Sequence, residues 1–289
     1  MINMEKIAEA GFVLSKRELV FLAAITGADE IYGIEDNISQ MGKEKINEEW
    51  QKAREQLQEK KYIEVELDNS ITIDDELYAL LEACCRPRAY FNYSGSEEGE
   101  PLHYRNIYIN ERIAVELDQD RVDKDTWILT PLVTLDKAAY NLKECFFTEK
   151  NYEKNGVKFE VTQEEFEEIN NLFEKEDKLK TIEFLINSGC SKDYAGDLFE
   201  AINGKNLFKS LFTIIFDYDN ITDFFNYSLY YGEKYIWQID TSGLKNNNKE
   251  NKIIFSSVSS EDIANGIDKV MNSLRHIFNE SIKGEEFYG

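Results

Sequence analysis

The chain has 289 residues with 56 acidic and 33 basic side chains, a formal charge of −23, and it combines 37 aromatic residues (18 Phe, 16 Tyr and 3 Trp) with only 3 prolines. This composition is typical of an ordered chain with many strands and excludes a collagen-like or disordered one. The negative charge repels phosphate backbones and anionic lipids, and no basic patch offsets it, so neither nucleic-acid nor membrane binding is expected.

The N-terminal stretch MINMEKIAEAGFVLS carries charges where a secretory signal would be apolar. The longest apolar run, residues 19–25, is too short to span a bilayer. Cys84, Cys85, Cys145 and Cys190 show neither metal-binding nor disulfide spacing. These features favour a cytoplasmic protein with reduced thiols.

Residues 15–84 are predicted to form two helices, a short hairpin and a third helix. Ser15 is a candidate cap for the first helix, and the second covers residues 43–60. YIEVELDNSITID (62–74) alternates apolar and polar residues around a turn at Asp68-Asn69, and Asp74 starts the third helix. The block resembles a winged helix, so a transcriptional regulator is one alternative. However, its candidate recognition helix, 43–61, carries six bases against five acids, which is too even a balance for DNA.

From Pro87 the apolar pattern has a period of two. RAYFNYS (88–94), LHYRNIYI (102–109), RIAVELD (112–118) and TWILTPL (126–132) predict an antiparallel meander, followed by a helix from Thr134 or Asp136.

The polar segment 148–160 is predicted to be a linker, and the pattern then repeats. Helices are expected over 162–174, 178–188 and 191–203, strands over 210–219, 223–231, 234–240 and 251–257, and a last helix from about Ser260. The predicted organisation is an N-terminal half (1–147), a linker (148–160) and a C-terminal half (161–289). The two halves share one sheet as a single domain.

The sequence of one predicted hairpin occurs twice in the chain. YINERIAVELD (108–118) matches YYGEKYIWQID (230–240) at a constant offset of 122, which predicts a pseudo-twofold duplication. Asn110 and Gly232 open the two turns, where a positive φ is expected.

Alternation separates two faces of the strand before each turn. The first face is predicted to pack on helices, and the second, which mixes Tyr, Asn and Ser, either to meet a partner or to remain a half-exposed sheet surface. The first face holds His103, Arg105, Ile107 and Ile109, matched by Phe225, Tyr227, Leu229 and Tyr231. The second holds Leu102, Tyr104, Asn106 and Tyr108, matched by Phe224, Asn226, Ser228 and Tyr230.

Signatures of catalysis are weak. The two histidines, His103 and His276, lie in no metal-binding motif, and the sequence contains no glycine-rich phosphate loop and no GxSxG elbow. Paired carboxylates arise readily among 56 acids. We therefore predict no enzyme activity, no cofactor and no metal site.

The order of several short motifs resembles a known family. The motifs are Phe12 and Leu14 with Glu18-Leu19, a tryptophan helix leading into a hairpin (Trp50 to Asp74), Arg86-Pro87 before the sheet, the strand IAV (113–115), and Leu129-Thr130-Pro131 before the closing helix. Together they are similar to the EspG-type chaperones of type VII (ESX) secretion, over nearly the whole chain.

The resemblance implies an α+β fold with a central antiparallel sheet flanked by two helical bundles in pseudo-twofold symmetry. It also implies a non-enzymatic cytosolic chaperone that binds a secretion substrate before export. A composition rich in Lys, Asn, Glu and Ile points to a low-GC Gram-positive (Firmicute) relative, and to a helical WXG100-like or LXG-type cargo. Carried onto this chain, the implied partner-binding positions are Gly95, Ser96, Glu97, Glu98, Tyr194, Phe199, Phe224, Asn226, Ser228 and Tyr230.

The strong acidity is also compatible with an alternative function, that of an immunity protein that captures a basic toxin through electrostatic steering. Both interpretations require a protein partner. Whether the protein is a monomer or a homodimer stays open at this level.

Overall fold

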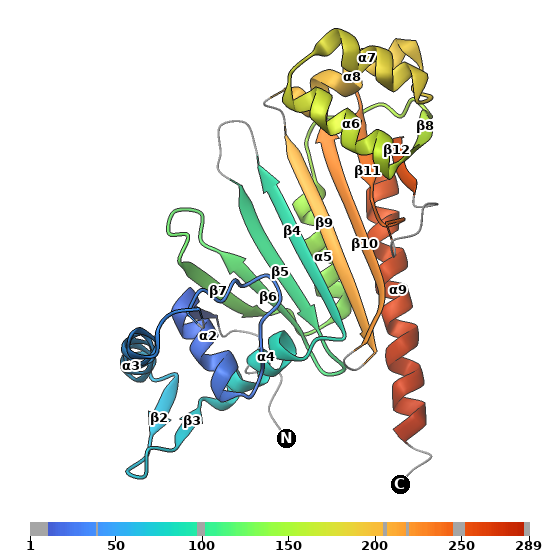
Figure 1. Ribbon diagram of the computed structural model, residues 1–289. Coiled ribbons are helices and arrows are strands. Elements are labelled where there is room, and N and C mark those ends of the chain that lie inside the picture. Colours follow the sequence, from blue (N-terminus) through green and yellow to red (C-terminus); the bar gives the residue numbers. More distant parts are fainter. Residues whose placement is uncertain are drawn as a thin grey trace. The chain divides into compact units, whose positions relative to one another are not determined.

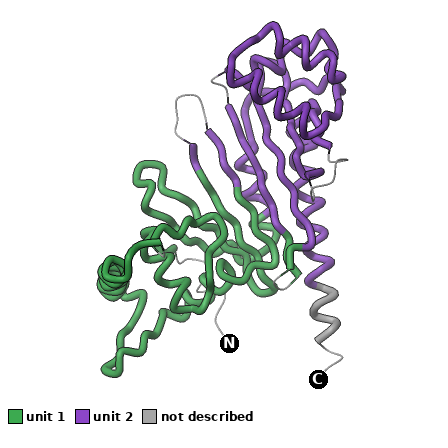
Figure 2. Tube along the Cα trace, viewed as in Figure 1, with its two compact units in different colours: residues 1–92, 104–138, 215–221 green, residues 93–103, 139–214, 222–289 purple. Residues whose placement is uncertain are grey.

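The computed structural model describes residues 11–38, 40–96, 102–204, 207–217, 220–244 and 252–285, with side chains up to residue 278. The chain divides into two compact units (Figure 2). Unit 1 comprises residues 1–92, 104–138 and 215–221, and unit 2 comprises 93–103, 139–214 and 222–289.

The first half of the chain closely follows the predicted elements, with one addition at the start. In order they are β1 (Phe12–Ser15), α2 (Lys16–Ile25), α3 (Lys43–Glu59), β2 (Ile63–Val65), β3 (Ile71–Ile73), α4 (Asp75–Cys85), β4 (Ala89–Ser96), β5 (His103–Ile109), β6 (Ala114–Gln119), β7 (Thr126–Pro131) and α5 (Leu135–Phe146). Strand β1 was not predicted and pairs with β7. Asn69 takes a φ of 66° at the predicted turn of the β2–β3 hairpin.

The second half also gains a strand. Its elements are β8 (Lys158–Thr162), α6 (Gln163–Glu174), α7 (Lys178–Asn187), α8 (Lys192–Asn203), β9 (Phe208–Asp217), β10 (Asn220–Tyr231), β11 (Ile236–Asp240), β12 (Lys252–Val258) and α9 (Ser260–Glu285). Residues 158–160, the end of the predicted linker, therefore start a strand. The reason is that Phe159 and Val161 alternate inward as β8 pairs with β12.

Ten strands form one antiparallel sheet in the order β1-β7-β6-β5-β4-β9-β10-β11-β12-β8, and β2 and β3 form a separate hairpin (Figure 1). The strand order reads alike from both ends, because each half contributes an early edge strand followed by its meander. Each edge strand leads into a helix through a capping box, Ser15 with Glu18 and Thr162 with Glu165. The fold is thus α+β with a large antiparallel sheet, as predicted.

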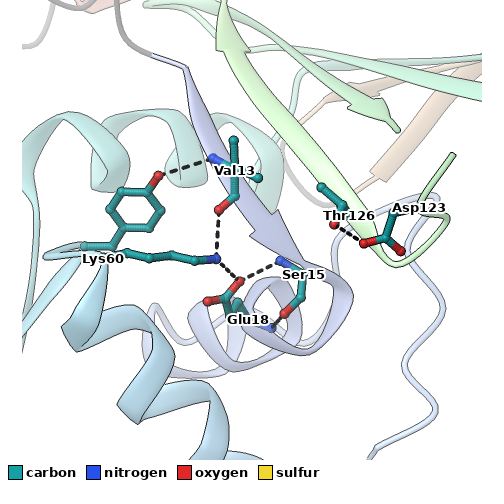
Figure 3. A network of polar contacts seen from close by, with 7 residues as sticks. Val13, Ser15, Glu18, Lys60, Asp123 and Thr126 are labelled. Atoms are coloured by element: carbon teal, nitrogen blue, oxygen red, sulfur yellow. Dashed lines mark hydrogen bonds and ion pairs between the residues drawn. The ribbon is translucent and has the colours of Figure 1, made fainter. Parts of the chain in front are cut away.

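Side chains close the outer edge of β1 in unit 1 (Figure 3). Val13 N donates to Tyr62 Oη (3.3 Å), and Lys60 Nζ donates to Val13 O (3.0 Å) and to Glu18 Oε2 (2.7 Å). The same carboxylate oxygen accepts from Ser15 N at 2.6 Å, and Glu18 is 0% exposed. Occupied backbone groups of this kind prevent an edge strand from pairing with another chain.

The second face of β5 is covered at its end nearest the turn, whereas Tyr104, further along the same face, is 38% exposed. The prediction that this face meets a partner or stays half-exposed is therefore wrong for Asn106 and Tyr108. Asn106 and Tyr108 are both 0% exposed. Tyr108 Oη donates to Tyr32 O at 2.6 Å, and Gly33, at a φ of 81°, has no room for a Cβ because Asn106 Oδ1 would lie 2.7 Å from it. The cover comes from the segment between α2 and α3, which has no periodicity that predicts it.

Neither repeated turn uses a positive φ, so that prediction is wrong. Asn110 instead accepts the backbone N–H groups of Arg112 and Ile113 on its Oδ1, which satisfies the turn through its side chain. Gly232 is needed for space, since an added Cβ would lie 2.9 Å from Asp197 Oδ1 on α8. Both hairpins nevertheless pair in the same register, at the offset of 122 residues seen in the sequence.

The connection from β7 to α5 contains a strained residue. Thr134 N donates to Leu132 O at 2.7 Å across Val133, whose φ is 65°. This is a γ-turn of the rare kind with a positive φ, and β-branched residues are especially unfavourable there.

Residues 215–221 belong to unit 1 although they lie late in the sequence. Phe216 N donates to Arg88 O at 2.9 Å, and the Phe216 ring lies 5.1 Å from that of Tyr32. The Arg88 guanidinium, which is nearly buried, pairs with Asp217 at 3.3 Å. The end of β9 thus supplies both core and charge to unit 1.

In unit 2, α6, α7 and α8 pack on β8, β11 and β12 around an apolar core. Phe159 stacks on Phe255 with ring centroids 4.9 Å apart. The indole of Trp237 is fully buried, and its Nε1 donates to Asp197 Oδ1 at 2.7 Å, so the one polar atom of this large side chain is satisfied.

Helix α9 in unit 2 begins with a third reciprocal cap, formed by Ser259 with Asp262. Asp262 accepts from Ser259 N at 2.8 Å and pairs with Lys154 at 2.9 Å. The hydrogen bond from Lys154, aided by those from Ser259, lowers the pKa of Asp262 to about 2.

Among the described residues, no helix has the length and apolar character required to cross a bilayer. All four cysteines are free thiols, as predicted, and burial raises the pKa of Cys190 to about 11.

Candidate protein-binding surface

The second face of β9 and β10 in unit 2 carries a band of half-buried aromatic and small polar side chains. We call it the sheet patch; its members are Phe208, Ser210, Phe212, Phe224, Asn226, Ser228 and Tyr230. The ring of Phe208 lies 5.2 Å from that of Tyr230, which places the two strands' side chains on the same face. Alternation along β9 then places Ser210 and Phe212 beside it.

The opposite face of these strands is closed. Leu229 and Tyr231 are buried, and Tyr231 Oη donates to Phe146 O at the end of α5 (3.4 Å). Lys209 is also buried, and its Nζ donates to Phe147 O at 3.0 Å and lies 5.5 Å from the Tyr231 ring centre. The prediction that the first face packs on helices is confirmed here, and the second face is the accessible one.

The polar members of the patch have unused hydrogen-bonding groups. The backbone of Asn226 is fully engaged, with its N–H bonded to Ser242 Oγ (2.9 Å) and its C=O to Thr241 N (2.9 Å). The side chains of Asn226 and Ser228, in contrast, make no hydrogen bond to any residue that the structure describes. They can therefore donate to and accept from a partner.

Tyr230 links the patch to the interior of unit 2. It lies directly opposite Trp237 in the β10–β11 ladder and packs against the core under α6 to α8. Burial raises the pKa of Tyr230 above its ordinary value, which favours the neutral phenol further. A rigid ring with a neutral hydroxyl at a half-open position suits a protein contact.

The implied partner-binding positions 95–98, in the acidic segment GSEEGE (95–100), differ in part from expectation. Gly95 and Ser96 are the last residues of β4, and Gly95 is buried, where an added Cβ would meet Tyr93 Oη at 2.2 Å and Phe208 O at 3.3 Å. Glycine therefore leaves room for the Tyr93 side chain, and Gly95 lies in a strand and not in a loop. Glu97 and Glu98 lie outside the described residues.

Of the two predicted positions on α8, one is accessible. Tyr194 is half-buried and packs edge-on against Tyr235, with centroids 5.4 Å apart. Phe199 is buried and stacks on Phe173 inside the helical core of unit 2.

The sequence did not single out Phe208 and Phe212. Strand β9 was predicted, but its run of apolar residues on both faces gave no sign of which face is open. The open face follows from contacts on the other one, where Lys209 Nζ donates to Phe147 O and Tyr231 Oη to Phe146 O at the end of α5.

The side-chain composition of the patch resembles that of protein interfaces. It has aromatic surface, an amide and hydroxyl groups, the mixture found at protein interfaces. Within the described ranges, no cluster of His, Cys, Asp and Glu is arranged to hold a metal ion.

Comparison with known proteins gives a fold relationship. No protein-family model matches the sequence, and no curated protein matches it. Among solved structures, the chain is similar to the Mycobacterium tuberculosis type VII secretion system chaperone EspG5, whose structure was solved in complex with the PE25–PPE41 dimer. The TM-score is 0.62 with 10% sequence identity, over 91% of this chain and 96% of that chain. The protein has an EspG-like fold. At 10% sequence identity, the similarity establishes the fold of the chain but not its function.

Proposed function

We propose that the protein is a non-enzymatic, cytoplasmic chaperone that binds a type VII secretion substrate before export. The observation that carries this proposal is the similarity of fold to EspG5 over 91% of the chain. That chaperone was solved bound to a protein dimer, which supports a protein as the partner here.

The sheet patch is the binding surface in this proposal. Tyr230 and Phe224 act as aromatic anchors, with Asn226 and Ser228 supplying hydrogen bonds between them. Anchors of this kind cost on the order of 2 kcal/mol of binding free energy each when truncated. Tyr194 on α8 extends the surface, whereas Phe199 supports the helices from inside.

The cargo we propose is a helical protein of the WXG100-like or LXG type. The Lys-, Asn-, Glu- and Ile-rich composition supports a low-GC Gram-positive source, in which such substrates are the expected partners. The charge of −23 favours a cargo with a basic contact surface, because opposite charges speed association.

We also propose that the fold arose by internal duplication, with the winged-helix-like block 15–84 as a packing module of the first copy. Three observations support this. The sheet order is symmetric, the two repeated hairpins share one register, and both edge strands run into capping boxes at Ser15 and Thr162.

The test is co-purification of the tagged full-length chain with the products of its neighbouring genes. We expect a helical, secreted protein to be retained in a stable complex. The double variant Phe224→Ser with Tyr230→Ser should weaken the affinity by about a thousandfold, because two anchors of about 2 kcal/mol each are lost. Leu179→Ser is the matched control, since this α7 side chain is 82% exposed and lies outside the patch.

Three outcomes contradict the proposal. One is the absence of any retained helical partner. Another is equal retention by the double variant and the wild type, which would refute the sheet patch as the surface. The third is a retained toxin whose activity is inhibited, which would establish the immunity role instead.

A further inference from the structure

The two edge strands of the large sheet differ in how their outward backbone groups are occupied. The outer edge of β1 in unit 1 is closed by the side chains of Tyr62 and Lys60. The outer edge of β8 in unit 2, whose strand neighbour is β12, has no such closure among the described residues. An open strand edge is a row of hydrogen-bond donors and acceptors with which a further strand can pair.

The hydrogen bonds to β12 determine which groups of β8 point outward. Ser257 N donates to Val157 O at 3.0 Å, a bond that continues the β8–β12 register by one pair. In an antiparallel ladder, the residues that bond to a given neighbour alternate along the strand. Every second residue from Val157 onward therefore bonds to β12, and the N–H and C=O groups of Lys158 and Glu160 point away from the sheet.

These outward groups are available to a partner. Outside the β8–β12 ladder, the backbone of Lys158 and Glu160 makes no hydrogen bond within the described ranges, and both side chains are exposed. The next outward N–H, that of Thr162, is already occupied, since it donates to Glu165 Oε2 at 2.8 Å in the capping box of α6. The open stretch is therefore short and centred on Phe159, whose side chain is buried in the core of unit 2.

The open stretch is complementary to itself. An antiparallel second copy of β8, centred on Phe159, places Lys158 of each copy opposite Glu160 of the other. The outward N–H and C=O groups of these two residues then pair in both directions, as in any hydrogen-bonded pair of an antiparallel ladder. Side chains of opposite charge at directly opposite positions stabilise such a ladder, and like charges destabilise it.

The charges also select one register. Sliding the second copy by two residues places Lys158 opposite its own equivalent in one direction, and Glu160 opposite its own equivalent in the other. Both of these shifted ladders bring like charges together. Lys158 makes no ion pair with a residue in the described part of the chain, whereas Glu160 pairs with Lys252 of β12 at 2.6 Å. The centred register gives each Lys158 a carboxylate.

We propose that β8 is a self-association edge, at which two copies of this chain pair through an antiparallel β8–β8 ladder about a twofold axis at Phe159. Such an interface is isologous, because each copy contributes the same residues. It is also small, so we expect a reversible dimer with a dissociation constant on the order of 100 µM. This surface is separate from the sheet patch and does not rest on the proposed chaperone function.

Sedimentation equilibrium of the full-length protein, over concentrations on both sides of the expected dissociation constant, measures the dimer. Lys158→Glu and Glu160→Lys each place like charges opposite one another, and each should weaken dimerisation by about tenfold. An equimolar mixture of the two variants should form a heterodimer with about the affinity of the wild type, because every cross-strand pair is again of opposite charge.

A backbone variant and a charge control complete the set. Glu160→Pro removes an outward N–H and leaves the bonds to β12 in place, since proline is tolerated at outward positions of an edge strand. It should weaken dimerisation by more than about tenfold. Glu183→Lys, at an exposed position of α7, makes the same change of charge as Glu160→Lys and should leave the dimer unchanged. Thermal unfolding followed by circular dichroism establishes that each variant is folded.

Several outcomes overturn the proposal. It fails if the chain remains monomeric well above the expected dissociation constant, or if a dimer forms that Glu160→Pro leaves intact. Opposite effects of Lys158→Glu and Glu160→Lys would mean that the net charge governs association and not pairing at β8. A mixture of these two variants that stays monomeric would refute the proposed register.

Discussion

The buried carboxylate of Glu18 gives the sharpest stability prediction. It is 0% exposed, its Oε2 accepts from Ser15 N and from Lys60 Nζ, and its Oε1 has no hydrogen-bond partner in the part of the chain that is described. Replacing Lys60 with Met removes the ammonium and leaves a buried charge with a single backbone donor.

The cost can be worked from this geometry. Removing one partner of a fully buried ion pair costs about 3–5 kcal/mol. The Lys60 side chain is 36% exposed, so solvent screens part of the interaction and a value of about 2 kcal/mol is more appropriate. The lost hydrogen bond to Val13 O adds about 0.5–1 kcal/mol. We therefore expect Lys60→Met to lower the free energy of unfolding by about 2–3 kcal/mol.

Urea unfolding followed by far-UV circular dichroism measures this effect. Lys52→Met is the matched control, because its pair with Glu49 is an exposed i,i+3 contact and should cost less than about 0.5 kcal/mol. Adding Glu18→Gln to Lys60→Met should restore part of the loss, since the amide oxygen still accepts from Ser15 N and carries no charge. Equal losses for the Lys60 and Lys52 variants, or a further loss on adding Glu18→Gln, would refute the reasoning.

Three further predictions concern single positions. Val133→Gly should raise the free energy of unfolding by about 1 kcal/mol, because relief of the strained φ outweighs the added entropy of the unfolded chain. The control Val122→Gly, at a loop position that is 94% exposed, should lower the free energy of unfolding. Urea titrations in which both variants change stability in the same direction would be inconsistent with strain at Val133. The folded-state pKa of Asp262 is about 2, against an ordinary value of 3.8, so its carboxylate stabilises the fold above pH 3.8 and this stabilisation is lost as the pH falls from 3.8 to about 2. Acid unfolding of Asp262→Asn should therefore depend less on pH in that range, and Lys154→Met should behave likewise. Gly232→Ala should lower the melting temperature by an amount equivalent to about 1 kcal/mol, since the new Cβ meets α8, and an unchanged value in a thermal scan would show that the turn has room.

The long elements could be read from the sequence, but the edges of the sheet could not. Strands β1 and β8 have 4 and 5 residues, too few for alternation to register, and each pairs with a strand roughly a hundred residues away in sequence. A usable local signal was nevertheless present. Ser15 with Glu18 and Thr162 with Glu165 are capping boxes that mark both helix starts, and an apolar pair lies just before each.

The predicted open face of the repeated strand agrees with the observed burial along β10 in unit 2, but not at the matching end of β5 in unit 1. On β10 the second face is half-open as predicted, whereas on β5 the matching Asn106 and Tyr108 are buried. The pattern of a strand states which residues share a face, but not what distant segment lies on that face. Here the cover is the connection through Tyr32 and Gly33, which carries no helical or strand periodicity.

The assignment of residues 215–221 to unit 1 has a consequence for how the protein is made. A fragment ending at residue 147 would contain Tyr32 and Arg88 without Phe216 and Asp217, their partners from the end of β9. During synthesis, the core of unit 1 therefore stays incomplete until residues 215–221 have left the ribosome. We expect separately expressed halves to be recovered in folded form only when they are produced together, since neither sequence half contains a whole unit.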